Sequence, residues 1–367
     1  MDRITERIVS DRIPSPSLYV DLDAADRNIR ATSGALAGTG IKLRPHFKAH
    51  KCTQLMHRQL DLGGHSGVTC ATAQEAVVLA RAGFADILVA NEIVERLDLD
   101  LIAAAARLAA LTVVVDHPIQ VARISSTASS SGVRIGVLID VDPGLGRTGV
   151  AFDSPEVVEL ARAIARCDSL VFRGIQAYEG HVVLQRDPEV RRVMSWQVAR
   201  LIEAAISNLQ RAGFDCELIS GGGTGTIQPA ISAGVLTEIQ AGSYVLMDTT
   251  YADIGLELEQ AVFGVATVIS RRSASSAAIN AGTKSMNTDK GMPRVLTAGA
   301  RLVGMGDEHG RLALDRTANL DVGDRVLLVP SHLDPTVNLH DVLLVESHGD
   351  LAVWRIDGRR MYMEEEV

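Results

Sequence analysis

One short stretch, LRPHFKAHKC at residues 43–52, places two histidines four positions apart on either side of a lysine, Lys48. On a helix, His46 and His50 would lie on one face and could offer two nitrogen ligands to a metal ion. In a strand, alternate side chains face opposite ways, so Arg44, His46 and Lys48 would share a face. The proline within the stretch favours the strand.

A strand here would direct these three basic groups into the interior of the fold. Burying a charge costs free energy unless the charge is paired, so each basic group is expected to have an anionic or covalent partner. They could be neutralised by buried acids. Alternatively, neighbouring positive charge and partial desolvation could activate Lys48 to form a Schiff base with an aldehyde cofactor that carries a phosphate. We favour the second interpretation, with the helical metal pair as the least favoured of the three.

Two glycine-containing loops could bind that phosphate. SGGGTGT at residues 220–226 and GSY at residues 242–244 each combine glycine with hydroxyl side chains. Glycine lets backbone N–H groups approach an anion, and a following helix adds its positive N-terminus. Each loop alone could equally be an ordinary turn. The candidate phosphate ligands are Gly222, Gly223, Thr224, Gly242, Ser243 and Tyr244.

A further pair of residues suggests a metal site near the C-terminus. In VPSHLDPTV, His332 and Asp334 are two positions apart and would lie on one face of an extended segment. Imidazole and carboxylate together suit a divalent ion. A hydrogen-bonded polar pair without metal is the alternative.

The elements that position these residues follow from the hydrophobic period. Short β-branched runs alternate with helix-patterned segments as far as residue 245, which is typical of parallel strands covered by helices. Nine candidate strands occur, whereas a (β/α)8 TIM barrel needs eight. We therefore assign the first strand, at residues 18–22, to a second domain or to the junction, and count the barrel strands from residue 41.

On this count every unusual residue falls at the carboxyl end of a strand, where barrel enzymes place catalytic groups. Lys48 closes strand 1, Arg147 lies in the GLGRTG loop after strand 5, and Tyr178 closes strand 6. The two glycine loops follow strands 7 and 8. Residues from about 259 onward alternate strands and turns. We expect a barrel at 24–254 and an all-β domain at 255–367 joined by the N-terminal strand, 1–23.

Composition narrows the class of partner. The formal net charge is −9 and no basic cluster carries interleaved aromatics, so nucleic-acid binding is not expected. No apolar run is long enough to span a membrane, and the first residues lack a signal peptide core, so we expect a cytoplasmic protein. The four cysteines lie far apart without a C-x-x-C motif, which predicts reduced thiols. The expected partner is a small molecule.

The segment RPHFKAHK resembles the R-P-H-x-K-[TA]-H-K motif of the D-threonine aldolase and D-serine dehydratase group. These are pyridoxal 5'-phosphate enzymes with the alanine racemase-like fold, a barrel followed by a β domain that the N-terminal residues complete. GLGRTGV, GIQAY, SGGGTGT, QAGSYVLMD and PSHLDPTVNLHD extend the resemblance over essentially the whole chain. It implies that Lys48 binds the cofactor covalently. Arg147 is placed to meet the cofactor's ring oxygen or the substrate carboxylate, with an ordinary loop arginine as the alternative, and Tyr178 at its strand end could pack on or hydrogen-bond to the cofactor region.

The resemblance also bears on the reaction. In the group, the positions of His332 and Asp334 bind a metal beside the cofactor; dehydratases have cysteine at the second position, and aldolases have aspartate. Asp334 suits a harder ion such as Mn²⁺ or Mg²⁺. The expected activity is therefore retro-aldol cleavage of a D-β-hydroxy-α-amino acid such as D-threonine, giving glycine and an aldehyde. A homodimer is implied by the resemblance alone.

One segment departs from the group. The D-threonine aldolases have H-G-x-x-x-H after the A-Y pair, whereas this chain has Glu179 and Leu184 at the two histidine positions and His181 between them. His181 could be the catalytic base, a metal-bound hydroxide could replace it, or His181 could only hold the loop. The G-H pattern is similar to dehydratases and 3-hydroxyaspartate-cleaving relatives, which leaves D-serine or 3-hydroxyaspartate dehydration and 3-hydroxyaspartate aldol cleavage as alternatives.

Two other classes of protein fit the sequence less well. A non-catalytic pyridoxal phosphate carrier would lack the C-terminal β domain and the H-x-D pair. A metal-dependent hydrolase would need more histidine or aspartate ligands at strand ends, and only His46 is evident.

Overall fold

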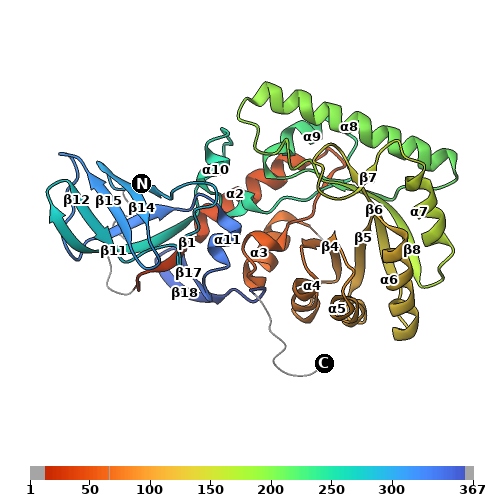
Figure 1. Cartoon of the computed structure of the whole chain (residues 1–367), viewed down its shortest axis with the longest axis horizontal. Helices are drawn as coiled ribbons and strands as arrows, with labels where there is room; N and C mark the ends of the chain where they lie inside the picture. The colour runs from red at the N-terminus through yellow and green to blue at the C-terminus, as the bar shows by residue number, and fades with distance from the viewer. Residues whose placement is uncertain (1–12, 66, 360–367) are drawn as a thin grey trace. The chain divides into compact units, whose positions relative to one another are not determined.

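The computed structural model describes residues 13–65 and 67–359, which divide into two compact units (Figure 1). Residues 32–48 and 55–242 form the barrel unit, and residues 13–31, 49–54 and 243–359 form the β unit. The domain ranges expected from the sequence, 24–254 and 255–367 with 1–23, stay a prediction. Residues 1–12 and 360–367 of those ranges lie outside the described residues.

The barrel unit contains eight parallel strands in the order β2-β10-β9-β8-β6-β5-β4-β3. A parallel bridge from His46 to Thr69 joins the two ends of this order and closes the ring. The predicted (β/α)8 architecture and its strand count are therefore confirmed. The strands are β2 (Lys42–Leu43), β3 (Val68–Cys70), β4 (Asp86–Glu92), β5 (Ala110–Val115), β6 (Ile135–Asp142), β8 (Leu170–Ala177), β9 (Leu218–Gly221) and β10 (Glu238–Ile239), with a short β7 (Val150–Ala151) paired to β6.

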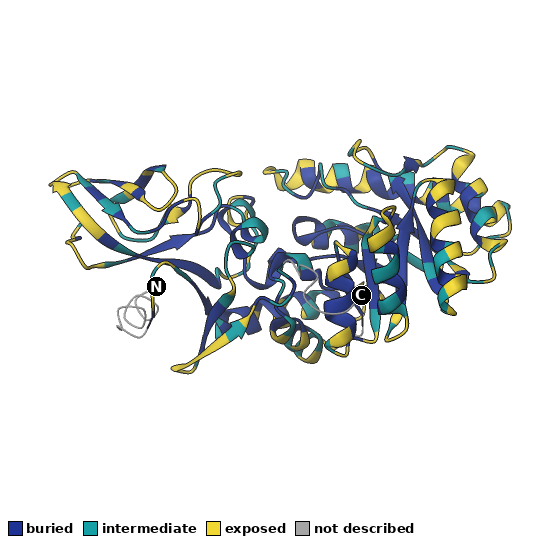
Figure 2. Cartoon of the chain, turned by 60° about the horizontal axis from the view of Figure 1, so that its bottom comes forward, coloured by how far each residue is buried: buried dark blue, intermediate teal, exposed yellow. Residues whose placement is uncertain are grey.

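Helices cover the outside of these strands, and Figure 1 shows α4 to α8 around them. α7 illustrates why: its buried residues Val157, Leu160, Ala161 and Ile164 recur at helical spacing and face the strands. Figure 2 shows the result, with buried strands and helices whose outer faces are exposed. The helices are α3 (Thr53–Gly63), α4 (Ala73–Arg81), α5 (Arg96–Ala106), α6 (Pro118–Ser131), α7 (Glu156–Ala165), α8 (Pro188–Arg211) and α9 (Ile227–Ala233), and α2 (Leu22–Leu36) crosses the division between the units.

The β unit has its own sheet, in the order β14-β15-β12-β11-β1-β17-β18, with β16 paired to β11 and β13. The first strand, β1, pairs antiparallel with β11 and parallel with β17, so its assignment outside the barrel was right. Its elements are β1 (Ser17–Asp21), α10 (Thr249–Ala252), β11 (Val262–Ser273), β12 (Ser276–Ile279), β13 (Arg294–Val295), β14 (Ala300–Met305), β15 (Gly310–Leu314), β16 (Arg325–Val329), α11 (Leu333–Val337), β17 (Val342–Ser347) and β18 (Asp350–Arg355).

The core of the β unit explains why the first strand belongs there. Tyr19 of β1 packs with Phe263, Val265, Leu327 and Leu344 in one buried cluster. Its hydroxyl donates a hydrogen bond to Glu346 of the neighbouring β17. Burying a tyrosine with its hydroxyl satisfied contributes strongly to stability, so β1 is a structural strand of this sheet.

All four cysteines are free thiols, as predicted, and Cys52 and Cys70 are buried. No helix among the described residues is both long and apolar enough to cross a membrane.

Candidate active site

Lys48 lies just beyond the first barrel strand. The pairing of that strand continues past Leu43, since the amides of Arg44 and His46 donate to Ile239 and Ala241. The chain then enters a 3-10 turn at Phe47–Ala49, so Lys48 follows the strand instead of ending it. Its side chain is partly buried at the carboxyl end of the barrel.

The helical metal pair is not supported by this backbone. The only helical residues near His46 and His50 are those of the three-residue 3-10 turn between them. His50 is fully buried, and its Nδ1 accepts a hydrogen bond from the amide of Cys52. No group of three or more His, Cys, Asp or Glu side chains in the described part of the chain is arranged to hold a metal ion.

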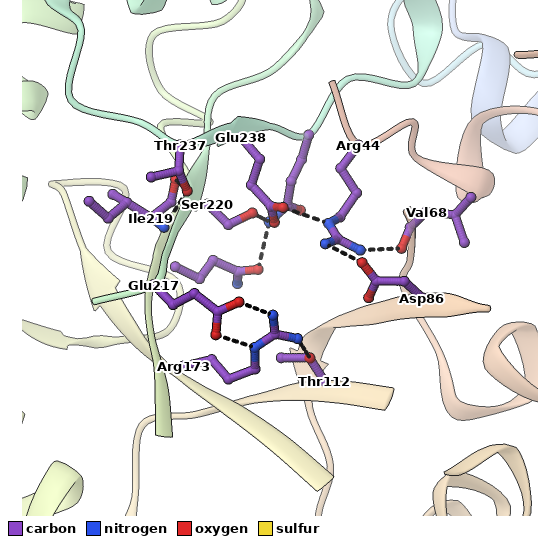
Figure 3. A network of polar contacts seen from close by, with 12 residues as sticks. Arg44, Val68, Asp86, Thr112, Arg173, Glu217, Ile219, Ser220, Thr237 and Glu238 are labelled. Atoms are coloured by element: carbon purple, nitrogen blue, oxygen red, sulfur yellow. Dashed lines mark hydrogen bonds and ion pairs between the residues drawn. The ribbon is translucent and has the colours of Figure 1, made fainter. Parts of the chain in front are cut away.

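Arg44 has a structural role at the opposite end of the barrel. Its Nε donates to Glu238 at 2.8 Å and its Nη2 to Asp86 at 2.9 Å, and both acids begin barrel strands (Figure 3). Only 5% of Arg44 is exposed. The interpretation that the basic groups of this stretch serve a cofactor is therefore wrong for Arg44, which buried acids neutralise.

The loop that carries Arg147 is held by two aspartates of β6. Asp142 accepts hydrogen bonds from the amides of Gly144, Leu145 and Gly146. Asp140 accepts one from the hydroxyl of Thr148 at 2.9 Å. These contacts fix a loop whose arginine is exposed. The loop is therefore preorganised to present a cation at the carboxyl end of the barrel.

Arg147 and Tyr178 meet directly. The guanidinium carbon lies over the Tyr178 ring, 5.2 Å from its centre, in a cation–π contact. His181 packs against the same loop, because a Cβ built on Gly144 would lie 3.6 Å from its Nε2. Its Nδ1 is buried and has no hydrogen-bond partner among the described residues. The structure therefore brings Arg147, Tyr178 and His181 together.

The first glycine loop follows β9 and needs its glycines. Gly222 has a φ of +69°, in the left-handed region. A Cβ on Gly223 would lie 2.9 Å from Cγ1 of Val183. The amide of Gly223 donates to the hydroxyl of Thr226 at 3.1 Å, so Gly223 supports the loop's shape instead of offering its amide to a ligand. Thr224 is buried in the 3-10 turn that follows.

Glu179, which stands where the family motif has histidine, supports this loop. It is 3% exposed and accepts a hydrogen bond from Ser195 of α8 at 2.8 Å. Burial raises the pKa of Glu179, partly offset by hydrogen bonds from Thr226 and Ser195. Glu179 thus links α8 to the glycine loop.

A buried polar network beneath the loops was also missed. Gln176 donates to Asp140 at 3.0 Å, and Gln240 donates to Gln176 at 2.9 Å. Glu92, at the end of β4, adds a second carboxyl near Asp140; burial and the charge of Asp140 raise the pKa of Glu92 to about 7. The only feature of the sequence that could have indicated this network is a polar residue at alternate positions of otherwise apolar strands.

The second glycine loop follows β10. Gly242 is the last barrel-unit residue of this stretch, and Ser243 and Tyr244 begin the part of the β unit that follows it in the chain. Both lie in a 3-10 turn (Ser243–Val245), and Tyr244 is fully buried. Their assignment as phosphate ligands stays a prediction.

In the β unit, His332 and Asp334 lie at the start of a helix. The expected extended segment is wrong here: His332 is the N-cap of α11 and Asp334 lies in its first turn, a position that suits a carboxylate. Nδ1 of His332 is 2.8 Å from Oδ2 of Asp289. Asp248, fully buried, accepts the amide of Leu333 at 2.9 Å. His332 therefore contacts Asp289, and Asp248 holds the backbone of the same turn.

The residues present fit the groups that the sequence implies. In the barrel unit, Lys48, the cation–π pair and the glycine loop all occupy carboxyl strand ends. In the β unit, burial and, to a smaller extent, the charge of Asp334 raise the pKa of Asp248 to about 6, against the lowering effect of its backbone hydrogen bonds and of His332. A divalent cation there would relieve repulsion between carboxylates, and imidazole with carboxylate is a suitable donor set.

Comparison with known proteins agrees with this architecture. A model described as the alanine racemase N-terminal domain matches residues 20–250, and one described as a putative serine dehydratase domain matches residues 261–346. The chain is 37% identical to a D-threonine aldolase of Arthrobacter sp over 355 residues, which cover 95% of this chain and 93% of that protein. It is 35% identical to a 3-hydroxy-D-aspartate aldolase of Paracoccus denitrificans (strain Pd 1222), over 95% and 92%. The crystal structure of D-threonine aldolase from Filomicrobium marinum superposes with a TM-score of 0.91 at 36% identity, covering 95% of each chain.

Proposed function

This chain belongs to the alanine racemase family, and we propose that it is an aldolase that uses pyridoxal phosphate and a divalent metal ion to cleave D-β-hydroxy-α-amino acids into glycine and an aldehyde. The observation that carries the proposal is the shared position of Lys48, Arg147, Tyr178 and the glycine loop at the carboxyl end of one barrel. Identity of 37% to a D-threonine aldolase over nearly the whole chain supports the reaction class.

Lys48 would attach the cofactor aldehyde and release it to the substrate amine. When bound, pyridoxal phosphate accepts the electron pair of the broken Cα–Cβ bond. The loop at Gly222 and Thr224 would hold the phosphate, together with Gly242, Ser243 and Tyr244. Arg147, steadied on the Tyr178 ring, would bind the cofactor's ring oxygen or the substrate carboxylate.

His181 is our candidate for the base that removes the proton from the β-hydroxyl. It lacks a hydrogen bond at Nδ1 within the described residues, so it does not simply tie down the loop through that atom. After the bond breaks, the aldehyde leaves and a proton delivered to Cα gives glycine. A base must reach the hydroxyl proton at hydrogen-bond distance.

His332 and Asp334 would hold the metal ion, which would polarise the β-hydroxyl. The carboxylate oxygen of Asp334 favours Mn²⁺ or Mg²⁺ over an ion that prefers sulfur. The presence of Asp334 also supports the aldolase over the dehydratase alternative. Because residues 261–346 match a serine dehydratase domain model, dehydration is the competing reaction that a product assay must test.

The second candidate substrate is 3-hydroxy-D-aspartate, because a relative named for it is 35% identical. The location in the cytoplasm and the homodimer remain predictions from the sequence.

Two measurements test the proposal. Borohydride treatment of the protein with pyridoxal phosphate should remove the visible absorbance of the cofactor and leave it covalently on the Lys48 peptide in mass spectrometry; labelling of another lysine would overturn the assignment. Comparing kcat/KM for D-threonine and 3-hydroxy-D-aspartate would then decide between the two substrates.

A further inference from the structure

The metal site in the β unit has a feature that the proposed ligands do not explain. Asp289 lies 43 positions before His332 in the sequence, yet its Oδ2 is 2.8 Å from Nδ1 of that histidine. Both side chains remain partly exposed, at 45% and 30%, so burial alone does not force the contact. The contact therefore depends on the backbone that holds Asp289.

That backbone is bound to α11 by several hydrogen bonds. The amide of Asn287 donates to the Thr336 hydroxyl at 3.3 Å, and this hydroxyl donates to the carbonyl of His332 at 2.7 Å. The Ser331 hydroxyl donates to the carbonyl of Asn287 at 3.3 Å. Oδ1 of Asn287 accepts the amide of Asp289 at 2.8 Å. The segment around Asn287 is thus hydrogen-bonded to residues on both sides of His332. The hydrogen bond from the amide of Asp289 to the Asn287 side chain holds Asp289 in place.

The position of the carboxylate determines the chemistry of the ring. A neutral imidazole has one N–H and one lone pair, and the hydrogen bond made by one nitrogen fixes which nitrogen can bind a metal. Because a carboxylate only accepts, Nδ1 of His332 must carry the proton. The lone pair is then on Nε2, at the far side of the ring from Asp289.

We propose that Asp289 is the positioning residue of the metal site, which fixes His332 in the tautomer and orientation that bind a divalent cation through Nε2. This inference rests on the proposed metal site at His332 and Asp334. Carboxylates that hold a metal-binding histidine in this way strengthen metal affinity about 10- to 100-fold.

The test measures Mn²⁺ binding to the purified full chain. The electron paramagnetic resonance signal of free Mn²⁺ reports how much of the ion is bound, and this measurement does not depend on turnover. Asp289→Ala should raise the Kd for Mn²⁺ about 10- to 100-fold. Asp289→Asn, which keeps an oxygen acceptor for the Nδ1 proton, should recover most of that loss. Asp350→Asn removes the same charge from an exposed position of β18 and should leave the Kd unchanged.

Unchanged near-ultraviolet circular dichroism would show that the variants are folded.

The possible outcomes separate the claim that the metal site exists from the claim that Asp289 positions His332. If the wild type does not bind Mn²⁺, or His332→Ala binds it equally well, the metal site itself is wrong and this inference falls with it. If His332→Ala loses binding but Asp289→Ala does not, the site stands and the role of Asp289 is overturned. A loss in Asp289→Asn as large as that in Asp289→Ala would contradict tautomer control, because the hydrogen-bond acceptor would then be irrelevant.

Discussion

The guanidinium carbon of Arg147 lies 5.2 Å from the centre of the Tyr178 ring and over its face. The two residues come from loops after neighbouring strands β6 and β8, which pair in parallel. An exposed arginine would otherwise sample many rotamers, so the ring restricts the direction in which this cation points.

Removing the ring should therefore weaken catalysis without removing the cation. A cation–π contact at an exposed site is worth about 0.5–1 kcal/mol, so Tyr178→Leu should lower kcat/KM by at least about 2- to 5-fold. Tyr178→Phe keeps the ring face and should stay close to wild type if stacking is what matters. A loss in the phenylalanine variant equal to that in the leucine variant would assign the role to the hydroxyl instead.

The Arg147 loop should lose its order when Asp142 is replaced. In Asp142→Ala the amides of Gly144, Leu145 and Gly146 lose their common acceptor. Hydrogen exchange at these amides should become faster, by about 10-fold or more, since hydrogen bonds to a charged group contribute about 1.5–3 kcal/mol. Asp142→Asn should give an intermediate rate. Equal protection in all three proteins would mean that Asp142 does not hold the loop.

Arg44 should be needed for stability. Arg44→Met leaves the buried Glu238 and the partly buried Asp86 without their cation, and breaking a buried pair in this way costs about 3–5 kcal/mol of unfolding free energy. Urea titration measures the loss. The double variant Arg44→Met with Glu238→Gln removes one uncompensated charge and should recover part of it. A loss below about 1 kcal/mol in the single variant would show that Arg44 is not a required partner.

Glu92 should make stability depend on pH. Burial, the charge of Asp140 and the charge of Asp116 raise its pKa from an ordinary 4.5 to about 7. Between these values the folded protein binds more protons than the unfolded chain, so stability falls as pH rises through this window, and the loss is complete above it. Glu92→Gln cannot undergo this loss. Its urea midpoint should exceed that of wild type by more at about pH 8 than at about pH 5. If the two urea midpoints differed by the same amount at both pH values, Glu92 would not be the group that makes stability depend on pH.

The sequence predicted the barrel because its strands are apolar runs that local periodicity reveals, and it predicted the role of β1 from the strand count. It could not predict that Arg44 and Lys48, four residues apart, lie at opposite ends of the barrel. The partners of Arg44 are 42 and 194 positions away. The turn at Phe47–Ala49 and the helix at Leu333–Val337 are too short for a periodic signal.

The same limit applies to the supporting residues of the candidate site. Asp289 and Glu92 have no motif around them, and Glu179 stands where the family motif has histidine, so the roles of all three arise from contacts that only the folded chain creates. Gly222 and Gly223 were recognisable because glycine marks a special backbone. Which of the two offers an amide depended on Thr226, whose bond to Gly223 the spacing did not reveal.

The most direct test of the proposed reaction is the identity of its products. Purified protein with pyridoxal phosphate and Mn²⁺ should convert D-threonine or 3-hydroxy-D-aspartate to equal amounts of glycine and aldehyde without ammonia. Lys48→Ala should abolish this conversion, and Asp334→Ala should reduce it strongly. Ammonia together with a keto acid would contradict the aldolase assignment and identify the protein as a dehydratase.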